Sequence, residues 1–272
     1  MSDLQFYYNL YRRDISNLSF LRHHRFSGFI VSMHQSGTHW LKHMLASAIS
    51  NQLNIDPPRY AYAGDMIGGT KDPVSYPGIP LFGHSHTIPS ILASSGIFRK
   101  LFTLPDYVIL VRDFRPMLVS HYEKWKDVYQ CEFSEYLRGD LRNNRFRSDI
   151  WWCIRFQNAW GRVNDKFPGK SMVMKYEDMT RAPREQLSRI NDFLRLGLSE
   201  SAIIHGIDES TKEKMAAKPT KPKHLEKKKS GAAVRIGGRT VDDLFSTEDK
   251  QFLSETCRKY LKYNFGYQYD YE

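Results

Sequence analysis

The stretch GFIVSMHQSGTHWLKHMLASA, residues 28–48, decides the expected fold of this chain. It begins with a short apolar run, 29–31, of the kind found in buried strands. Apolar residues then recur at helical spacing: Trp40, Leu41, Met44, Leu45 and Ala48. Between them lies the loop 32–37, rich in small and hydroxylated residues. This order predicts an anion site, because the first helical amides have no partner within the helix and the helix dipole is positive there.

The loop 32–37 is not a Walker A loop, which requires Gly, four residues and then Gly-Lys-Ser/Thr. Here Gly37 is followed by Thr38, and the next lysine is Lys42. The stretch GDMIGGTK, 64–71, has its Thr and Lys in the reverse order and follows no clear strand, so we interpret it as a surface loop. Taken alone, the loop 32–37 favours an ordinary turn between a strand and a helix over a phosphate site.

The composition is that of an ordered α/β domain with anionic partners. Of the 272 residues, 41% are hydrophobic and 26% are charged, and the net charge is +10. This length is enough for one full core, so we expect a single domain over 1–272. The positive charge favours nucleic acid, anionic membranes or phosphorylated nucleotides as partners.

Cysteine usage and hydropathy indicate the compartment. Three scattered cysteines are too few for a disulfide framework or a CxxC metal site, which favours a reducing environment. The N-terminal residues lack the apolar region of a signal peptide, and no apolar run has the length of a membrane span. We therefore expect a cytoplasmic protein without a membrane span.

Further strands and helices alternate along the chain. The strongest strand signal is YVILV at 107–111, a continuous apolar run typical of a strand covered on both faces. Weaker strands are expected at 79–83 and 171–175. Helices are expected to begin at Pro116, Ser148 and Pro183, and a last helix to follow the cap Ser246 with Asp249. The fold class predicted is α/β, a central parallel β-sheet flanked by helices.

Three segments are not expected to belong to this alternation. Residues 1–27 predict a lead-in segment packed on the surface. Residues 54–80, rich in Pro, Gly, Tyr and Asp, predict a long irregular connection near the ligand crevice. Residues 212–239 are crowded with Lys and Arg and predict a mobile segment that could cover a polyanionic ligand.

Four stretches in order resemble the sulfotransferases that use 3′-phosphoadenosine 5′-phosphosulfate (PAPS). SGTHW at 36–40 resembles the family's PKSGTTW loop, which holds the 5′-phosphosulfate. VILVRDFRPMLVSHY at 108–122 is similar to the 3′-phosphate motif, and MVMKYEDM at 172–179 resembles the strand that ends in Tyr-Glu-Asp. RIGG at 235–238 is similar to the late Arg-x-Gly motif. The resemblance implies a single-domain fold with a P-loop-like phosphosulfate-binding loop, PAPS as co-substrate and adenosine 3′,5′-bisphosphate (PAP) as product.

The resemblance also implies site residues. Those expected to bind the nucleotide are Gln35, Ser36, Gly37, Thr38, His39, Trp40, Arg112, Ser120, Tyr176, Ser210, Thr211, Arg235, Ile236 and Gly237. Trp40 could stack on adenine, and a role in the core is the alternative. Ser210 and Thr211 precede Lys212, near which the family commonly has a Phe that covers the adenine.

A histidine is the expected proton acceptor, because its pKa lies near working pH. GHSHTIP at 83–89 is the counterpart of the family's Lys-Thr-His-Leu-Pro stretch, which makes His86 the predicted base and places His84 at the Lys position. Thr87 shifts the register, so His84 stays the alternative base. A metal site at the two histidines is the less favoured interpretation, since no third ligand is evident.

Two departures mark a divergent member of the cytosolic or bacterial small-molecule type. Gln35 stands where the family has a Lys that assists the leaving phosphate. Three alternatives follow: the helix amides with Thr38 and His39 carry more of the stabilisation, a Lys from elsewhere supplies it, or activity is low. The short dimerisation motif of cytosolic animal members is not recognisable near Phe245, which leaves the oligomeric state open.

The predicted function is transfer of the sulfuryl group from PAPS to a hydroxyl or amine of a small-molecule acceptor, without metal and without nucleic acid. The alternatives are a nucleotide-dependent phosphotransferase, disfavoured by the missing Walker Lys, and a nucleic-acid binder acting through the Lys-rich segment. A binder of that kind would lose affinity steeply with salt, whereas a nucleotide site would be saturable by PAP.

Overall fold

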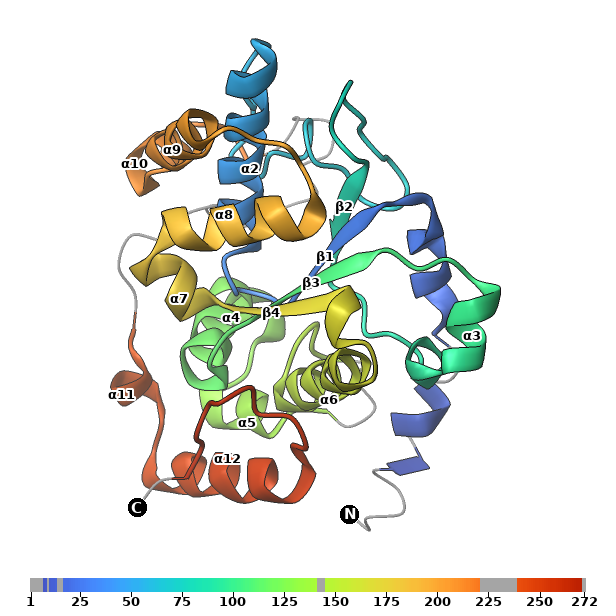
Figure 1. The fold of residues 1–272 in the computed structure, drawn as a ribbon. Helices are drawn as coiled ribbons and strands as arrows, with labels where there is room; N and C mark the ends of the chain where they lie inside the picture. The colour runs from blue at the N-terminus through green and yellow to red at the C-terminus, as the bar shows by residue number, and fades with distance from the viewer. Residues whose placement is uncertain (1–6, 9, 14–16, 141–144, 221–238, 271–272) are drawn as a thin grey trace.

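The computed structural model describes residues 7–8, 10–13, 17–140, 145–220 and 239–270. Its centre is a sheet of four parallel strands, in the order β2-β1-β3-β4 (Figure 1). The strands are β1 (Gly28–Ser32), β2 (Phe82–Ser85), β3 (Asp106–Val111) and β4 (Ser171–Lys175). The α/β class and the parallel sheet predicted from the sequence are confirmed. Both central strands are buried along their whole length, as expected of a parallel sheet covered on both faces.

Helices form a layer on each face of the sheet (Figure 1). One apolar cluster joins Ile30, Val108 and Leu110 of the sheet to the first layer of helices. These helices are α2 (Thr38–Leu53), α7 (Tyr176–Arg181), α8 (Pro183–Leu194) and α9 (Glu200–Asp208). The strand residues of alternate position, such as Phe29 and Val31, belong to the cluster on the opposite face. Its helices are α4 (Phe114–Tyr129), α5 (Phe133–Arg138), α6 (Ile150–Lys166) and α12 (Thr247–Tyr260).

Shorter elements connect these layers. They are η1 (Leu18–Arg25), η2 (Ile91–Ser94), α3 (Gly96–Leu101), η3 (Pro168–Lys170), α10 (Lys212–Ala216) and α11 (Val241–Leu244). The predicted capping box of the last helix is present, since the Ser246 side chain accepts from the Asp249 amide and the Asp249 side chain accepts from the Ser246 amide. Within the described parts of the chain, no helix has the length and apolar character needed to cross a membrane.

The order of the strands places a crevice at the carboxyl ends of β1 and β3. These neighbouring strands are followed by α2 and α4, which lie on opposite faces of the sheet. The loops that leave the two strands therefore diverge, and ligands of open α/β sheets bind at such a point. The loop 33–37 and the segment 112–113 line this position.

Three sequence-based boundaries were wrong. The helix expected to begin at Ser148 is α6, which begins at Ile150 because Asp149 caps it by accepting from the Trp152 amide. The strand expected at 79–83 is β2, which begins at Phe82 because Ile79 bonds back to Tyr76 and pairing with β1 starts at Gly28 opposite Phe82. The helix expected to begin at Pro116 is α4, which begins two residues earlier because Asp113 caps it by accepting from the Arg115 amide.

The three segments expected outside the alternation have the following outcomes. Within the predicted lead-in segment, Phe20, His23 and Phe26 are buried, so this segment contributes to the core in addition to packing on it. The basic segment begins with helix α10, and residues 221–238 lie outside the described residues. The connection 54–80 contains no helix or strand among the named elements, as predicted.

Candidate active site

The loop after β1 is shaped by residues with positive φ. Gly37 has φ of 85° and Gln35 has φ of 54°. A Cβ on Gly37 would lie 2.7 Å from Cδ2 of Tyr176 and 2.9 Å from Cε of Met179, so only glycine fits without displacement. Gly37 is also the N-cap of α2, where no side chain caps the helix and no acidic residue lies in the first turn. The first amides of α2 are therefore available to an anion.

Arg112 joins the loop to the ends of β3 and β4. Its Nη1 donates to the Gln35 carbonyl oxygen over 2.6 Å, and its guanidinium lies 4.3 Å from the centre of the Tyr176 ring. Its Nε is buried without a hydrogen-bond partner among the described residues. We call Gln35, Gly37, Arg112 and Tyr176 the loop group. Three of the four stretches that carry the family resemblance thus meet in direct contact.

Hydrogen bonds from buried hydroxyl groups stabilise the loop after β1. Ser36 is buried and donates to the Met33 carbonyl oxygen over 2.6 Å. Thr38 donates to the Ser32 hydroxyl oxygen over 2.8 Å, and both residues are buried. These bonds fix the turn between β1 and α2, so the conformation of the loop does not depend on a ligand.

Trp40 and Ser210 are brought together at the outer side of α2. The indole Nε1 of Trp40 donates to the Ser210 carbonyl oxygen over 2.9 Å. The Ser210 hydroxyl donates to the Gly206 carbonyl oxygen and lies 2.7 Å from Nδ1 of His43, so that side chain is engaged in the fold. Thr211 caps α10 by accepting from the Lys214 amide.

His86 lies just after β2 and faces the end of β1. Its Nδ1 is 2.8 Å from the Ser32 carbonyl oxygen and 3.2 Å from the Ser32 hydroxyl. Since a carbonyl only accepts, Nδ1 carries the hydrogen and Nε2 has a free lone pair. Burial lowers the pKa of His86, and Lys42 and Lys124 lower it further, while the Ser32 bond partly offsets this. His86 is therefore neutral near pH 7, as a proton acceptor must be.

The alternative base, His84, is held differently. It is a residue of β2 opposite Ile30, and its Nδ1 donates to the Gly68 carbonyl oxygen over 3.3 Å, within the connection 54–80. Burial lowers its pKa to about 3. His84 thus ties the strand to the connection, whereas His86 is tied to the strand that leads into the loop.

His39, expected to bind the nucleotide, lies in the first turn of α2. Its ring stacks on Tyr62 of the connection, with centroids 3.7 Å apart and planes 9° apart. Its Nδ1 is buried without a hydrogen-bond partner among the described residues, and burial lowers its pKa well below 6.5. This stacking joins the first turn of α2 to the connection 54–80.

Two histidines at the site were not among the predicted residues. His34 stacks on His86 with centroids 4.1 Å apart, and its ring is 5.7 Å from that of His121 on α4. Burial is the first cause of the lowered pKa of both, which for His121 is about 3. We call His34, His39, His84, His86 and His121 the histidine group. The position of His34 inside the loop was the available signal, whereas nothing local distinguished His121.

The remaining predicted residues are less informative. Ser120 is half-buried in the second turn of α4, and Arg235, Ile236 and Gly237 lie outside the described residues. No group of three or more His, Cys, Asp or Glu side chains in the described ranges could hold a metal ion.

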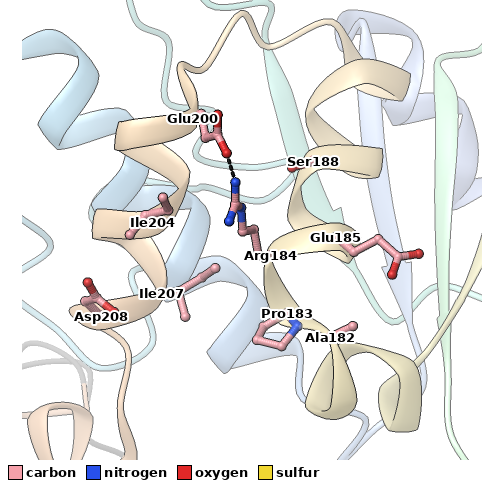
Figure 2. A pocket seen from close by; sticks show the side chains of 9 residues that line it. All are labelled: Ala182, Pro183, Arg184, Glu185, Ser188, Glu200, Ile204, Ile207 and Asp208. Atoms are coloured by element: carbon pink, nitrogen blue, oxygen red, sulfur yellow. Dashed lines mark ion pairs between the residues drawn. The ribbon is translucent and has the colours of Figure 1, made fainter.

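A surface hollow between α8 and α9 lies apart from the predicted residues (Figure 2). Its lining contains none of the residues expected to bind a nucleotide, and an ion pair between Arg184 and Glu200 spans it. Such an exposed pair contributes little to stability. The hollow is therefore separate from the candidate nucleotide site at the loop group.

Solved structures with the same fold bind PAP. The mouse sulfotransferase SULT7A1, complexed with PAP, has a TM-score of 0.59 and 14% identity, over 91% of this chain and 91% of that chain. Retinol dehydratase, in a complex with retinol and PAP, has a TM-score of 0.59 and 16% identity, over 93% of this chain and 86% of that chain. Its complex with androsterone and PAP has a TM-score of 0.55 and 16% identity, over 86% and 80%. At these identities the likeness shows the fold alone.

Sequence comparisons give the family. No curated protein matches the chain. The family model of the sulfotransferase domain matches residues 79–264, which is more than half of the chain. This range includes His86, Arg112 and Tyr176, the residues that the resemblance singled out after the first loop. The chain belongs to the sulfotransferase domain family.

Proposed function

We propose that this protein is a PAPS-dependent sulfotransferase that transfers the sulfuryl group to a hydroxyl or amine of a small-molecule acceptor, with His86 as general base. The contact of Arg112 with Gln35 and Tyr176 carries this proposal, because it joins three motifs at the crevice between β1 and β3. A half-buried guanidinium, whose buried Nε lacks a partner among the described residues, suits a phosphate of the nucleotide. The family and the PAP-bound relatives of the same fold support this assignment.

The reaction needs one proton acceptor and stabilisation of one leaving group. The acceptor oxygen or nitrogen attacks sulfur and loses its proton to Nε2 of His86, the nitrogen left free by the Ser32 bond. The bond between sulfur and the phosphate oxygen breaks, and its electron pair stays on the phosphate of PAP. The uncapped amides of α2 face the position where this charge develops.

Calorimetric titration with PAP, beside adenosine 5′-phosphate, tests the proposal. We expect the wild type to bind PAP and to bind adenosine 5′-phosphate at least tenfold more weakly, since a charge-assisted hydrogen bond contributes about 1.5–3 kcal/mol. Arg112→Ala should remove most of this preference. Arg181→Ala, which removes an exposed arginine of α7, is the matched control and should bind as the wild type. Equal binding of both nucleotides by the wild type would overturn the proposal.

The acceptor can then be sought by its chemistry. Incubation of the enzyme with PAPS and a panel of phenols, sterols, sugars and amines, read out as PAP formed, identifies the class that is turned over. The transferase assignment would be contradicted if the protein binds PAP but no acceptor class raises the rate at which PAP is formed from PAPS.

A further inference from the structure

A buried lysine of α2 has no partner that accounts for its charge. Lys42 is 2% exposed, and among the hydrogen bonds and ion pairs of the described residues none involves its ammonium group. Burying a cation is costly unless it is paired. Asp65 of the connection 54–80 raises the pKa of Lys42, but burial has the larger effect and lowers it to about 8. Lys42 therefore requires a role beyond packing.

The position of Lys42 on the helix directs it toward the loop after β1. It follows Thr38 by four residues, so both lie on the same face of α2. Side chains of a helix lean toward its N-terminus, and the lysine stem spans about one turn, roughly 5.4 Å. The ammonium thereby reaches the level of the first turn, where Thr38 bonds to Ser32.

The electrostatic neighbours of Lys42 agree with this direction. Its charge lowers the pKa of His39 on α2, of His84 on β2 and of His86 after β2. His86 is itself bonded to Ser32 at the start of the loop. The ammonium therefore lies near the three imidazoles, on the side of the loop where His86 offers Nε2.

We propose that Lys42 binds the phosphate through which the sulfuryl group is attached to the nucleoside and donates a hydrogen bond to the oxygen that leaves sulfur. This inference rests on the function proposed above. When that oxygen takes up the electron pair, a charge-assisted bond from a buried ammonium stabilises it more than the ground state. Gln35, at the position where the resemblance places a lysine, has no charge to offer. Lys42 supplies the missing cation from α2 in place of the loop.

Binding of two nucleotides separates this role from a structural one. PAP carries a 5′-phosphate, and adenosine 3′-phosphate does not. In calorimetric titrations Lys42→Met should lower the affinity for PAP about 10- to 100-fold, as expected for a lost charge-assisted bond. Its affinity for adenosine 3′-phosphate should equal that of the wild type. Lys218→Met is the matched control, because the Lys218 ammonium already donates to the Pro58 carbonyl oxygen and contacts His43.

A second variant shows whether a loss of PAP affinity in Lys42→Met comes from the missing cation or from misfolding. The double variant Lys42→Met with Gln35→Lys restores the cation from the loop and should recover most of the PAP affinity. The melting temperature of Lys42→Met without ligand should equal or exceed that of the wild type, because an unpaired buried charge is removed. Equal PAP affinity in Lys42→Met and the wild type would overturn the inference, whereas a wild type that binds no PAP would overturn the proposed function instead.

The pH dependence supplies a further readout. The titratable groups that face Lys42 are His39, His84, His86 and Asp65. Above pH 7 the three histidines are neutral, and Lys42, whose pKa is about 8, is the group that changes charge. PAP affinity of the wild type should fall between pH 7 and 9.5 and stay level in Lys42→Met. Identical profiles for the two proteins would contradict the inference.

Discussion

The loop group and the histidine group lie at the same end of the sheet but differ in the interactions that position their side chains. The loop group is fixed by short polar contacts, such as the bond from Arg112 to the Gln35 carbonyl, and by the close fit of Tyr176 against Gly37. The histidine group combines ring stacking and burial with bonds from Nδ1 of His84 and of His86 to carbonyl oxygens, so it differs from the loop group chiefly in its stacked, buried rings. Apart from other imidazoles, the charged side chains that lower the pKa values of these histidines are Lys42, Lys124 and Arg147.

This difference separates two tasks. Contacts of fixed geometry suit recognition of one ligand shape, as a nucleotide requires. Burial among cations disfavours the imidazolium form, so the histidines remain neutral near pH 7. Substitutions in the loop group should therefore change nucleotide affinity, and substitutions in the histidine group should change turnover and the response to acid.

The largest effect is expected at His86. His86→Ala should lower turnover by about 10²–10⁴-fold, the usual contribution of a general base, while PAP affinity changes little. Single-turnover measurements of PAP formation with the best acceptor of the panel provide the rate, and calorimetry the affinity. Added imidazole should restore part of the rate.

His84→Ala is the matched comparison for His86→Ala, since both rings donate from Nδ1 to a carbonyl oxygen. A greater loss of turnover in His84→Ala, with rescue by imidazole there and not in His86→Ala, would transfer the role of base to His84. That result would still leave nucleotide affinity to the loop group and turnover to the histidine group. Loss of PAP affinity in His86→Ala would contradict this assignment of tasks.

A smaller effect is expected at Gly37. Gly37→Ala places a side chain in a left-handed conformation, which costs about 1–2 kcal/mol, and against the Tyr176 ring. PAP affinity should fall roughly 5- to 30-fold, from the same cost expressed as a ratio. Calorimetric titration measures it. Gly64→Ala is the control, since nothing lies within 4 Å of the added Cβ. Unchanged PAP affinity in Gly37→Ala would mean that the loop conformation does not matter for binding.

The smallest effect concerns acid stability of the histidine group. The pKa of His121 falls from 6.5 to about 3 on burial, so the unfolded chain binds this proton more readily than the folded protein. The contribution of neutral His121 to the free energy of unfolding is complete above pH 6.5. It is lost as the pH falls toward 3, at about 1.4 kcal/mol per pH unit. His121→Phe should reduce the slope of unfolding free energy against pH by about that amount.

Urea unfolding at pH 7, 6 and 5 measures the slope. His24→Phe, at an exposed position, controls for the substitution itself. Parallel slopes for His121→Phe and the wild type would show that His121 is protonated in the folded protein.

The loop group was predictable from sequence because each of its members belongs to a local motif. Strand, loop and helix at 28–48 gave the anion site, and Arg112 and Tyr176 follow strands whose carboxyl ends must meet in a parallel sheet. Their contact with the loop follows from topology. Boundaries at 79–83 and Pro116 were missed, because they depend on a bond between Ile79 and Tyr76 and on the cap at Asp113.

Two of the five members of the histidine group, His34 and His121, could not be predicted in the same way. His34, His121 and Tyr62 come from a loop, a helix and an irregular connection, and their packing depends on tertiary contacts without a sequence period. Likewise, Lys42 occurs at a helical position that sequence alone would assign to the surface, and its burial is visible only once the connection 54–80 is placed.

The hydroxyl of Tyr267 donates to the Glu177 carboxylate, whose other oxygen accepts from the Asp113 amide at the end of β3. The ring of Tyr269 stacks on Phe114 at the first turn of α4. During synthesis on the ribosome, Glu177 precedes Tyr267 by 90 residues. A nascent chain can therefore complete its sheet well before the segment between β3 and α4 is locked. Competence to bind a nucleotide should be one of the last properties that the newly made protein acquires.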